Sequence, residues 1–446
     1  MNMVEIICKK RDKQKLSQEE IEYFITNYTN GTIPDYQASA LCMAILLNGM
    51  DDEEISQMTM AMAESGETLN LSEHAEFSVD KHSTGGVGDK TTLIVQPIVA
   101  SCGVAVAKMS GRGLGYSGGT IDKLESIPGM RTDLSKEEFL DQLQTIGSVI
   151  SGQSKHLAPA DGKLYALRDV TGTVPSQALI ASSIMSKKLA VSTNAILLDV
   201  KVGKGAFMKT VEDATQLARR MVNIGRYNGR IMRAELSDMN QPLGSMVGNI
   251  LEVKEAIAML KGEPVADDLY EHCIDSSALL LEMASKAATF EEGIVMAEEA
   301  LRSGQAFEKL KEMIAAQGGD VSYLDHPEKF PEAPFIETVN AERDGYISEI
   351  DAQIVGETSV ELGAGRHKKT DTLDYRVGIE IHHKVGDEVK TGDPLFTVHA
   401  NSSELLEYAK KELLSAHSFS DVPVEKLPQF YGIVEGNAEG NLYNLF

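Results

Sequence analysis

Hydrophobic residues recur at helical spacing through the first 65 residues of the chain. Ser17 and Glu20 have the spacing of a capping box, and so do Asp51 and Glu54. The apolar positions that follow the first pair are Ile21, Phe24, Ile25 and Tyr28. Those that follow the second pair are Ile55, Met58 and Met62. Because each set lies on one face of a helix, the pattern predicts an amphipathic helical region at the N-terminus.

From about residue 78 the pattern changes to short apolar runs beside glycine-rich turns. Residues 91–95 and 195–200 are rich in aliphatic side chains and predict buried strands that alternate with helices. Glycine and proline residues among charges between 317 and 345 indicate a boundary. After it, short alternating runs up to about residue 398 predict a small β-rich module. The expected class is α/β.

The composition is that of a globular chain, with 446 residues, 42% hydrophobic and 24% charged. This length favours about three domains. The net charge of -25 argues against nucleic-acid or membrane partners, which are bound by basic surfaces. Four cysteines without paired spacing, no secretory segment and no long apolar run lead us to expect a cytoplasmic protein that does not enter a membrane.

Two glycine-rich stretches, residues 80–89 and 108–120, predict a single anion site. Glycine lets the backbone approach a ligand closely, and the interleaved hydroxyl groups and Lys81 supply donors to phosphate oxygens. Neither stretch matches a Walker loop or a dinucleotide fingerprint. His82 lies within the first stretch. Because histidine titrates near neutral pH, we expect His82 to donate a proton to a leaving group.

A second set of polar residues follows, consisting of Tyr165, Arg168, Ser183 and Lys187. In a helix, Ser183 and Lys187 would share one face because they are four residues apart. Arg and Lys donors beside a hydroxyl group suit a planar ligand that carries carbonyl groups. Taken alone, this set is equally consistent with ordinary surface charge.

Three long motifs, at residues 80–89, 110–126 and 199–208, resemble those of the thymidine and pyrimidine-nucleoside phosphorylases, and the resemblance runs nearly from end to end. It implies reversible phosphorolysis of uridine, thymidine and deoxyuridine to a free base and (2-deoxy-)α-D-ribose 1-phosphate. It also implies a homodimer whose subunits have a helical lobe, a larger α/β lobe with a central mixed sheet, and a C-terminal α+β module. The helical lobe would comprise residues 1–70 and 160–192, and the α/β lobe would comprise residues 71–159 and 193–325. A linker would follow at 326–344, and the C-terminal module would comprise residues 345–446.

The same resemblance implies roles for individual residues. Phosphate would be bound by Lys81, Ser83, Thr92, Lys108, Met109, Ser110 and Thr120. The base would be held by Tyr165, Arg168, Ser183 and Lys187. Catalysis would involve His82, Arg168 and Lys187, with His82 beside the O2 carbonyl of the base. A structural K⁺ would be held, largely by backbone carbonyls, at Gly88, Lys90, Leu243, Met246 and Glu255. No organic cofactor is expected, and inorganic phosphate is a co-substrate.

Lys108 resembles the broad-specificity branch of the family, because a lysine there could donate to a ribose 2′-hydroxyl. The alternatives are a thymidine-specific phosphorylase, a Mg²⁺-dependent phosphoribosyltransferase of the same fold, and a nucleoside-binding protein without activity. Phosphorolysis is favoured because the histidine, arginine and lysine set is complete.

Overall fold

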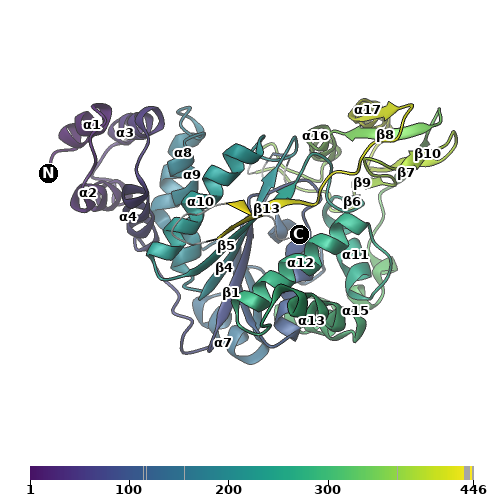
Figure 1. The fold of residues 1–446 in the computed structure, drawn as a ribbon, viewed down its shortest axis with the longest axis horizontal. Helices are drawn as coiled ribbons and strands as arrows, with labels where there is room; N and C mark the ends of the chain where they lie inside the picture. The colour runs from purple at the N-terminus through teal and green to yellow at the C-terminus, as the bar shows by residue number, and fades with distance from the viewer. Residues whose placement is uncertain (114, 117, 155, 369, 436–441, 444–446) are drawn as a thin grey trace.

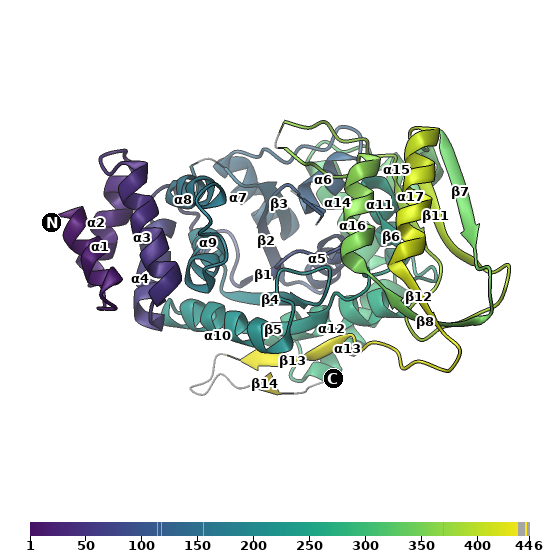
Figure 2. The same cartoon turned by 90° about the horizontal axis from the view of Figure 1, so that it is seen from above.

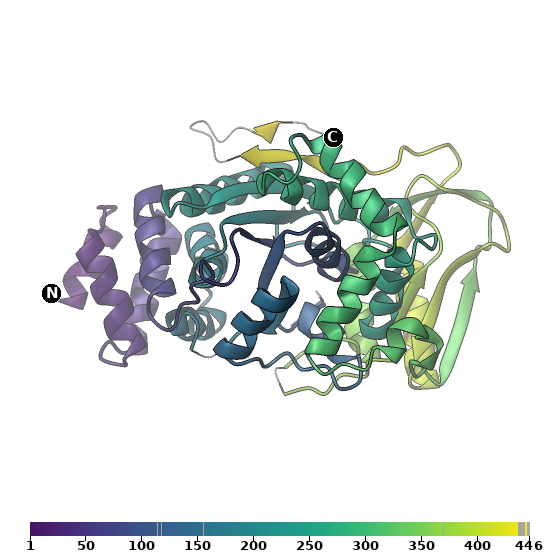
Figure 3. The same cartoon turned by 90° about the horizontal axis from the view of Figure 1, so that it is seen from below.

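The computed structural model describes the chain except residues 114, 117, 155, 369, 436–441 and 444–446. A helical lobe and a C-terminal region lie at opposite ends of a large sheet (Figures 1–3). Among the described residues, none of the helices has the length and apolar character needed to cross a membrane.

The helical lobe is built from the predicted N-terminal helices and two later ones. They are α1 (Met3–Arg11), α2 (Gln18–Thr29), α3 (Asp35–Asn48), α4 (Asp52–Ala63), α8 (Pro159–Asp169) and α9 (Gln177–Ala190). Both predicted capping boxes are present, at Ser17 with Glu20 and at Asp51 with Glu54. The apolar stripes that follow them are buried, as predicted. Helices α8 and α9 pack on α2, α3 and α4 (Figure 2).

The central sheet has seven strands in the order β14-β13-β5-β4-β1-β2-β3. Their bounds are β1 (Ser78–Ser83), β2 (Ala105–Ser110), β3 (Ser148–Gly152), β4 (Ala195–Val202), β5 (Ile231–Asp238), β13 (Phe430–Glu435) and β14 (Leu442–Tyr443). Strands β1 to β5 pair in parallel. Strand β13 pairs antiparallel with β5 on one side and with β14 on the other, which confirms the mixed sheet. The carboxyl ends of parallel strands meet at one edge, where ligands bind in such folds.

Helices flank this sheet. They are α5 (Thr91–Ser101), α6 (Thr120–Glu125), α7 (Lys136–Ile146), α10 (Val211–Tyr227), α11 (Asn249–Leu260), α12 (Asp267–Met283), α13 (Phe290–Arg302) and α14 (Gln305–Ala316). The prediction of a strand at 91–95 was wrong, because these residues begin α5. Residues 91–100 are all buried, so the helix is surrounded by core and lacks the polar face that periodicity needs.

The C-terminal region contains two small sheets, β10-β8-β12 and β6-β9-β11-β7. The strands are β6 (Met246–Val247), β7 (Phe335–Asn340), β8 (Gly345–Ile350), β9 (Gly378–Ile381), β10 (Glu388–Val389), β11 (Pro394–Ala400) and β12 (His417–Ser420). The helical segments are α15 (Ser322–Asp325), η1 (Pro327–Lys329), α16 (Ala352–Leu362) and α17 (Ser403–Ala416).

Four strands, β6, β7, β13 and β14, cross the predicted domain boundaries. Strand β7 lies inside the expected linker, and β6 carries residues of the α/β region into a C-terminal sheet. Strand β13 leaves the C-terminal region and pairs with β5 of the central sheet (Figure 1). Strand pairing therefore joins the α/β region and the C-terminal region twice, through β6 in a C-terminal sheet and through β13 in the central sheet.

Candidate active site

Two adjoining cavities lie at the carboxyl ends of β1 and β2. One of about 260 Å³ is lined by the glycine-rich stretches and is called here the anion cavity. The other, of about 220 Å³, has mostly apolar walls and is called the apolar cavity. Both are lined by His82, Ser83, Thr84, Tyr165 and Phe207. These shared residues place the two cavities side by side, and the pair is called the cleft below.

Most of the predicted phosphate ligands line the anion cavity. They are Ser83, Thr92, Lys108, Met109, Ser110 and Thr120. The backbones of Gly113 and Gly119 pack so closely that only glycine fits at position 119. A Cβ placed on Gly119 would lie 2.0 Å from the backbone nitrogen of Gly113. Gly85 has a φ of 95°, which glycine adopts without strain. The glycine-rich stretches thus form the walls of a polar cavity suited to an anion.

Lys81 is the exception among the predicted phosphate ligands. Its Nζ lies 2.5 Å from Thr91 Oγ1 and 2.5 Å from Asp199 Oδ2, and its side chain is buried outside the anion cavity. Neighbouring side chains on a strand point to opposite faces, so Lys81 and His82 cannot both face the cavity. The Asp199 carboxylate therefore holds the ammonium group outside the anion cavity.

Asp199 is the centre of a buried charge cluster. Its Oδ2 lies 2.8 Å from Lys201 Nζ and 2.9 Å from His272 Nε2, in addition to Lys81. Burial opposes ionisation of Asp199, but the lysine charges hold the pKa of its carboxyl well below the ordinary value. Burial and the Asp199 charge together raise the pKa of Glu235 to about 8. One carboxyl of the cluster is therefore ionised and the other protonated at neutral pH.

Two further lysines converge on Asp80, which precedes Lys81 and lies on the other face of β1. Lys188 Nζ lies 2.8 Å from Asp80 Oδ2, and Lys108 Nζ lies 3.5 Å from Asp80 Oδ1. Lys108 also donates a hydrogen bond to the carbonyl oxygen of Lys81. Burial lowers the pKa of Lys108 to about 8, with Lys188 adding to the decrease and Asp80 opposing it.

Lys188 is a cavity residue that the sequence analysis did not include among the expected site residues. The side chain is buried, lines the anion cavity and donates to the carbonyl oxygen of Met109 at 3.0 Å. The burial of α9 is a property of the tertiary structure, so local sequence gave no signal for this residue.

His82 lies where the two cavities meet, as its predicted role requires. Burial and then the charges of four lysines, Lys188, Lys108, Lys187 and Lys81, lower its pKa well below the ordinary value. The expectation that His82 titrates near neutral pH is therefore corrected. A neutral imidazole retains one N–H donor, so His82 can still donate a hydrogen bond into the cleft.

The second predicted set is also brought to the cleft, from α8 and α9. Lys187 Nζ lies 3.2 Å from Ser183 Oγ, which confirms that the two residues share a helix face. Asp161 Oδ2 accepts from the same ammonium group at 2.5 Å. Lys187 lines the anion cavity, Ser183 lines the apolar cavity, and Tyr165 lines both.

Arg168 lines the apolar cavity, with its guanidinium group turned toward backbone carbonyls. It donates to the carbonyl oxygens of Thr173 at 3.3 Å, Val174 at 2.7 Å and Leu179 at 3.1 Å. A guanidinium group has five N–H donors, and these bonds use three of them. Arg168 thus fixes the 173–179 segment that forms part of the cavity wall.

Lys90 is one of the five residues expected at the K⁺ site, and its contacts decide whether the set fits an ion. Its Nζ lies 2.8 Å from Leu243 O, 2.9 Å from Met246 O and 2.5 Å from Glu255 Oε2. Burial opposes the lysine charge, but Glu255 and Glu252 raise the pKa of Lys90 above its ordinary value. At 4 Å, a K⁺ ion would meet a repulsion of about 4 kcal/mol from this ammonium group. These residues therefore do not fit a K⁺ ion.

Family comparisons divide the chain into three matched segments. Residues 4–66 match the helical bundle domain of a glycosyl transferase family, and residues 75–307 match its a/b domain. Residues 346–420 match the pyrimidine nucleoside phosphorylase C-terminal domain.

The chain is also similar to curated proteins over most of its length. It is 52% identical to the pyrimidine-nucleoside phosphorylase of Geobacillus stearothermophilus, over 95% of this chain and 98% of that protein. It is 52% identical to the pyrimidine-nucleoside phosphorylase of Bacillus subtilis (strain 168), over 92% of this chain and 95% of that protein. A solved anthranilate phosphoribosyltransferase from Thermus thermophilus has a TM-score of 0.58 at 20% identity, over 70% of this chain and 98% of that one. This last match shows a shared fold.

Proposed function

We infer that this chain, which belongs to the pyrimidine-nucleoside phosphorylase family, is a pentosyltransferase that cleaves pyrimidine nucleosides with inorganic phosphate. The observation that carries this inference is the cleft, in which a polar anion cavity adjoins an apolar cavity of suitable size for a planar base. The reaction needs both compartments side by side, because a phosphate oxygen must reach C1′ of the sugar whose base is leaving. The products would be a free base and a (2-deoxy-)ribose 1-phosphate.

The residues divide the work according to the cavity they line. Hydroxyl groups of Ser83, Ser110 and Thr120 and the glycine amides would orient phosphate toward C1′. As the C1′–N1 bond breaks, the bonding electrons go to the base and negative charge develops on its carbonyl oxygens. The neutral His82 N–H lies at the junction, where it would donate to the O2 carbonyl, and the Lys187 ammonium adds positive charge nearby. Donors aimed at developing charge stabilise the transition state more than the ground state.

The reaction is tested with uridine, thymidine and deoxyuridine, each incubated with inorganic phosphate and followed by the absorbance of the released base. We expect cleavage that requires phosphate, or arsenate in its place, and that proceeds without Mg²⁺. A requirement for Mg²⁺ and a pyrophosphate-bearing sugar would instead indicate a phosphoribosyltransferase, and cleavage of thymidine alone would indicate the narrower phosphorylase. Binding of nucleosides without cleavage would contradict the proposal.

Lys108 is proposed to admit ribonucleosides by donating to the 2′-hydroxyl. Lys108→Met should cost uridine about 1.5–3 kcal/mol in kcat/KM, the value of a charge-assisted hydrogen bond. Thymidine, which lacks the 2′-hydroxyl, is the matched control and should change less. Because the pKa of Lys108 is about 8, its charge is lost above that pH. The uridine kcat/KM of the unmodified enzyme should therefore fall as pH rises past 8, and this limb should vanish in the variant. Equal losses for both nucleosides would contradict the role.

The homodimer implied by the family resemblance has a candidate surface on α3. Tyr36, Met43 and Leu47 lie on one face of this helix and are 75%, 37% and 73% exposed. Val4 of α1, which packs on α3, is also exposed. Exposed apolar residues grouped on adjoining helices indicate an association surface, and we propose that a second copy of the chain covers it.

Leu47→Glu should weaken this dimer. Burying a leucine contributes about 1.5–3 kcal/mol, and a twofold interface contains the residue twice. We therefore expect the dissociation constant to rise by at least about 100-fold. Sedimentation equilibrium measures this dissociation constant. The control is Val422→Glu, at an exposed position in the C-terminal region, which should leave the mass of the dimer in solution unchanged. A dimer equally stable in both variants would place the interface elsewhere.

The cytoplasm remains the proposed location. All four cysteines, Cys8, Cys42, Cys102 and Cys273, are free thiols in the structure, as a reducing compartment would keep them. Fractionation of cells that produce the chain tests this expectation.

A further inference from the structure

We propose that the Lys90 ammonium group permanently replaces the monovalent cation expected from the family resemblance, so that this chain needs no K⁺. The stability part of the proposal stands on the contacts of Lys90 alone, and the catalytic part rests on the proposed function. An ammonium group resembles K⁺ in being a compact single positive charge, and backbone carbonyls coordinate K⁺ in proteins. The side chain at position 90 would thus supply from within the chain the charge that an ion would otherwise bring.

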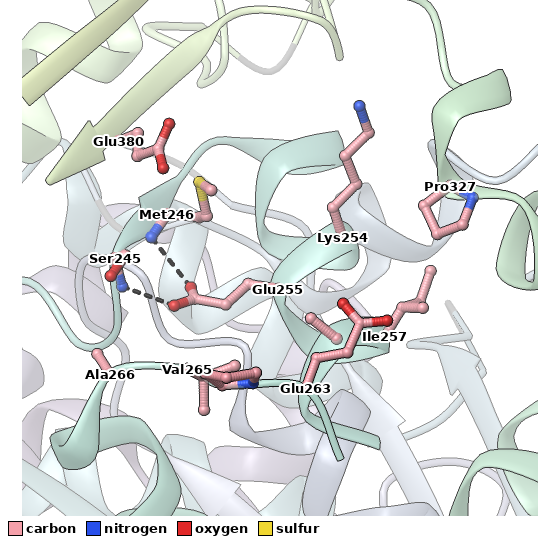
Figure 4. A pocket seen from close by; sticks show the side chains of 12 residues that line it. Ser245, Met246, Lys254, Glu255, Ile257, Glu263, Val265, Ala266, Pro327 and Glu380 are labelled. Atoms are coloured by element: carbon pink, nitrogen blue, oxygen red, sulfur yellow. Dashed lines mark hydrogen bonds between the residues drawn. The ribbon is translucent and has the colours of Figure 1, made fainter. Parts of the chain in front are cut away.

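The acceptors around Lys90 are held in place independently of the lysine. Glu255 reaches from α11 to the backbone of the 245–246 segment, where its Oε1 accepts from Ser245 N at 2.7 Å and its Oε2 accepts from Met246 N at 3.0 Å (Figure 4). The carboxylate and the two carbonyl oxygens of Leu243 and Met246 therefore form a rigid oxygen site, referred to below as the oxygen cage. A cage of this kind needs a positive charge at its centre.

Two glycines pack closely against the groups that surround the ammonium group. A Cβ placed on Gly244 would lie 2.7 Å from Lys90 Nζ and 2.8 Å from Glu255 Oε2. A Cβ placed on Gly88 would lie 2.5 Å from Leu243 O. Lys90 itself is 1% exposed. Packing is therefore close on the Gly88 and Gly244 sides of the oxygen cage, and the cation within it is the lysine.

The loop that carries the cage receives a second lysine from the C-terminal region. Lys384 Nζ lies 2.6 Å from both Pro242 O and Gly244 O, and 2.7 Å from Asp268 Oδ2. The carbonyls of residues 242, 243, 244 and 246 are thus shared between two ammonium groups from different regions. The charge needed to order this loop is already provided by the chain.

Lys90 also connects the cage to the anion cavity. It is the residue before α5, and Thr92 in the first turn of that helix lines the cavity. On the other side of the same segment, Lys123 donates to Asp89 O at 2.7 Å and pairs with Glu252 of α11 at 2.9 Å. Fixing Lys90 against α11 therefore positions the start of α5 and the hydroxyl group that faces phosphate.

The unmodified protein gives the first test. Its melting temperature and its kcat/KM for uridine should be the same in KCl and in tetramethylammonium chloride of equal ionic strength, because tetramethylammonium is too large for the cage. A melting temperature or a rate that rises with K⁺ would overturn the proposal. The melting temperature remains informative even if the proposed reaction is wrong.

Lys90→Ser gives the second test by opening the cage. Serine removes the ammonium group, keeps an oxygen ligand and is a favoured residue before a helix. A cation can reach Glu255 through a cavity of about 440 Å³ that is also lined by Ser245 and Met246 (Figure 4). At a K⁺ concentration 100 times its dissociation constant, the variant should melt about 3 °C higher than in tetramethylammonium chloride.

The matched control is Lys10→Ser. Lys10 is also buried and pairs with a glutamate, at 2.7 Å from Glu54 Oε1, but within the described part of the chain its ammonium group donates to no backbone carbonyl. This variant should be destabilised equally in both salts. Crystals of Lys90→Ser soaked in RbCl should show an anomalous peak between Leu243 O and Met246 O, and those of the unmodified protein should not. A folded Lys90→Ser variant that binds no Rb⁺ and melts at the same temperature in both salts would overturn the proposal.

Discussion

Replacing His82 by alanine is expected to lower kcat for uridine by about 10²- to 10³-fold, the usual loss when one donor to a developing oxyanion is removed. The reason is its place at the junction of the two cavities, where its N–H can reach the departing base. Phosphate KM should change little, because the hydroxyl groups and amides of the anion cavity are retained. Steady-state kinetics with phosphate varied at saturating uridine measures both quantities.

The pH profile distinguishes a neutral donor from a titrating acid. Burial, and then the charges of four neighbouring lysines, hold the pKa of His82 well below its ordinary value, so the ring is already neutral where the enzyme is assayed. The limb near pH 8, assigned to Lys108, should therefore survive in His82→Ala. His82→Gln, whose amide keeps an N–H donor, should recover part of the lost kcat. If the limb disappears in the alanine variant, or if phosphate binding alone is lost, this role for His82 is wrong.

Asp199→Asn is expected to cause the largest loss of stability, about 3–5 kcal/mol, because it leaves buried lysine charges without a partner. Lys81 Nζ lies 2.5 Å and Lys201 Nζ 2.8 Å from the carboxylate that the substitution neutralises. Both lysines are buried, so water cannot replace the lost charge. The melting temperature at neutral pH measures the effect.

Glu235→Gln is the matched control in the same cluster. Because the pKa of Glu235 is raised to about 8, its carboxyl is already neutral at pH 7, and an amide should cost little there. A raised folded-state pKa means that the folded chain binds more protons than the unfolded chain, so this carboxyl stabilises the fold at low pH. That stabilisation is lost as pH rises from the ordinary carboxyl range to about 8, and Glu235→Gln should remove this part of the pH dependence. Equal destabilisation by the two substitutions would show that both carboxyls are ionised.

Local pattern was sufficient for helices α2 and α4 of the helical lobe and for the location of the cleft. The capping boxes at Ser17 and Asp51 depend on residues three apart, and the buried stripes depend on helical spacing, so both can be read within one turn or two. The glycine-rich stretches are likewise contiguous in sequence. Their role follows from the small size of glycine, which does not depend on distant neighbours.

The direction and charge of the polar side chains depended on tertiary structure. Lys81 turns away from the anion cavity because Asp199, 118 residues later, accepts a hydrogen bond from its ammonium group. His82 is neutral because burial, and then the charges of lysines from β1, β2 and α9, lower its pKa. The segment at 91–95 was mistaken for a strand because core packs around the whole circumference of the helix that it begins. Such a helix lacks the polar face by which periodicity identifies it.

The sequence by itself therefore determined the family, the glycine-walled cleft and the residues that line most of it, because these are recorded in contiguous motifs. Only the tertiary structure decided what each charged group does, because a buried charge takes its partner from wherever the fold brings one. Lys90 is the clearest case. Its sequence position matched an expected cation ligand, and its pairing with Glu255, 165 residues away, made it the cation instead.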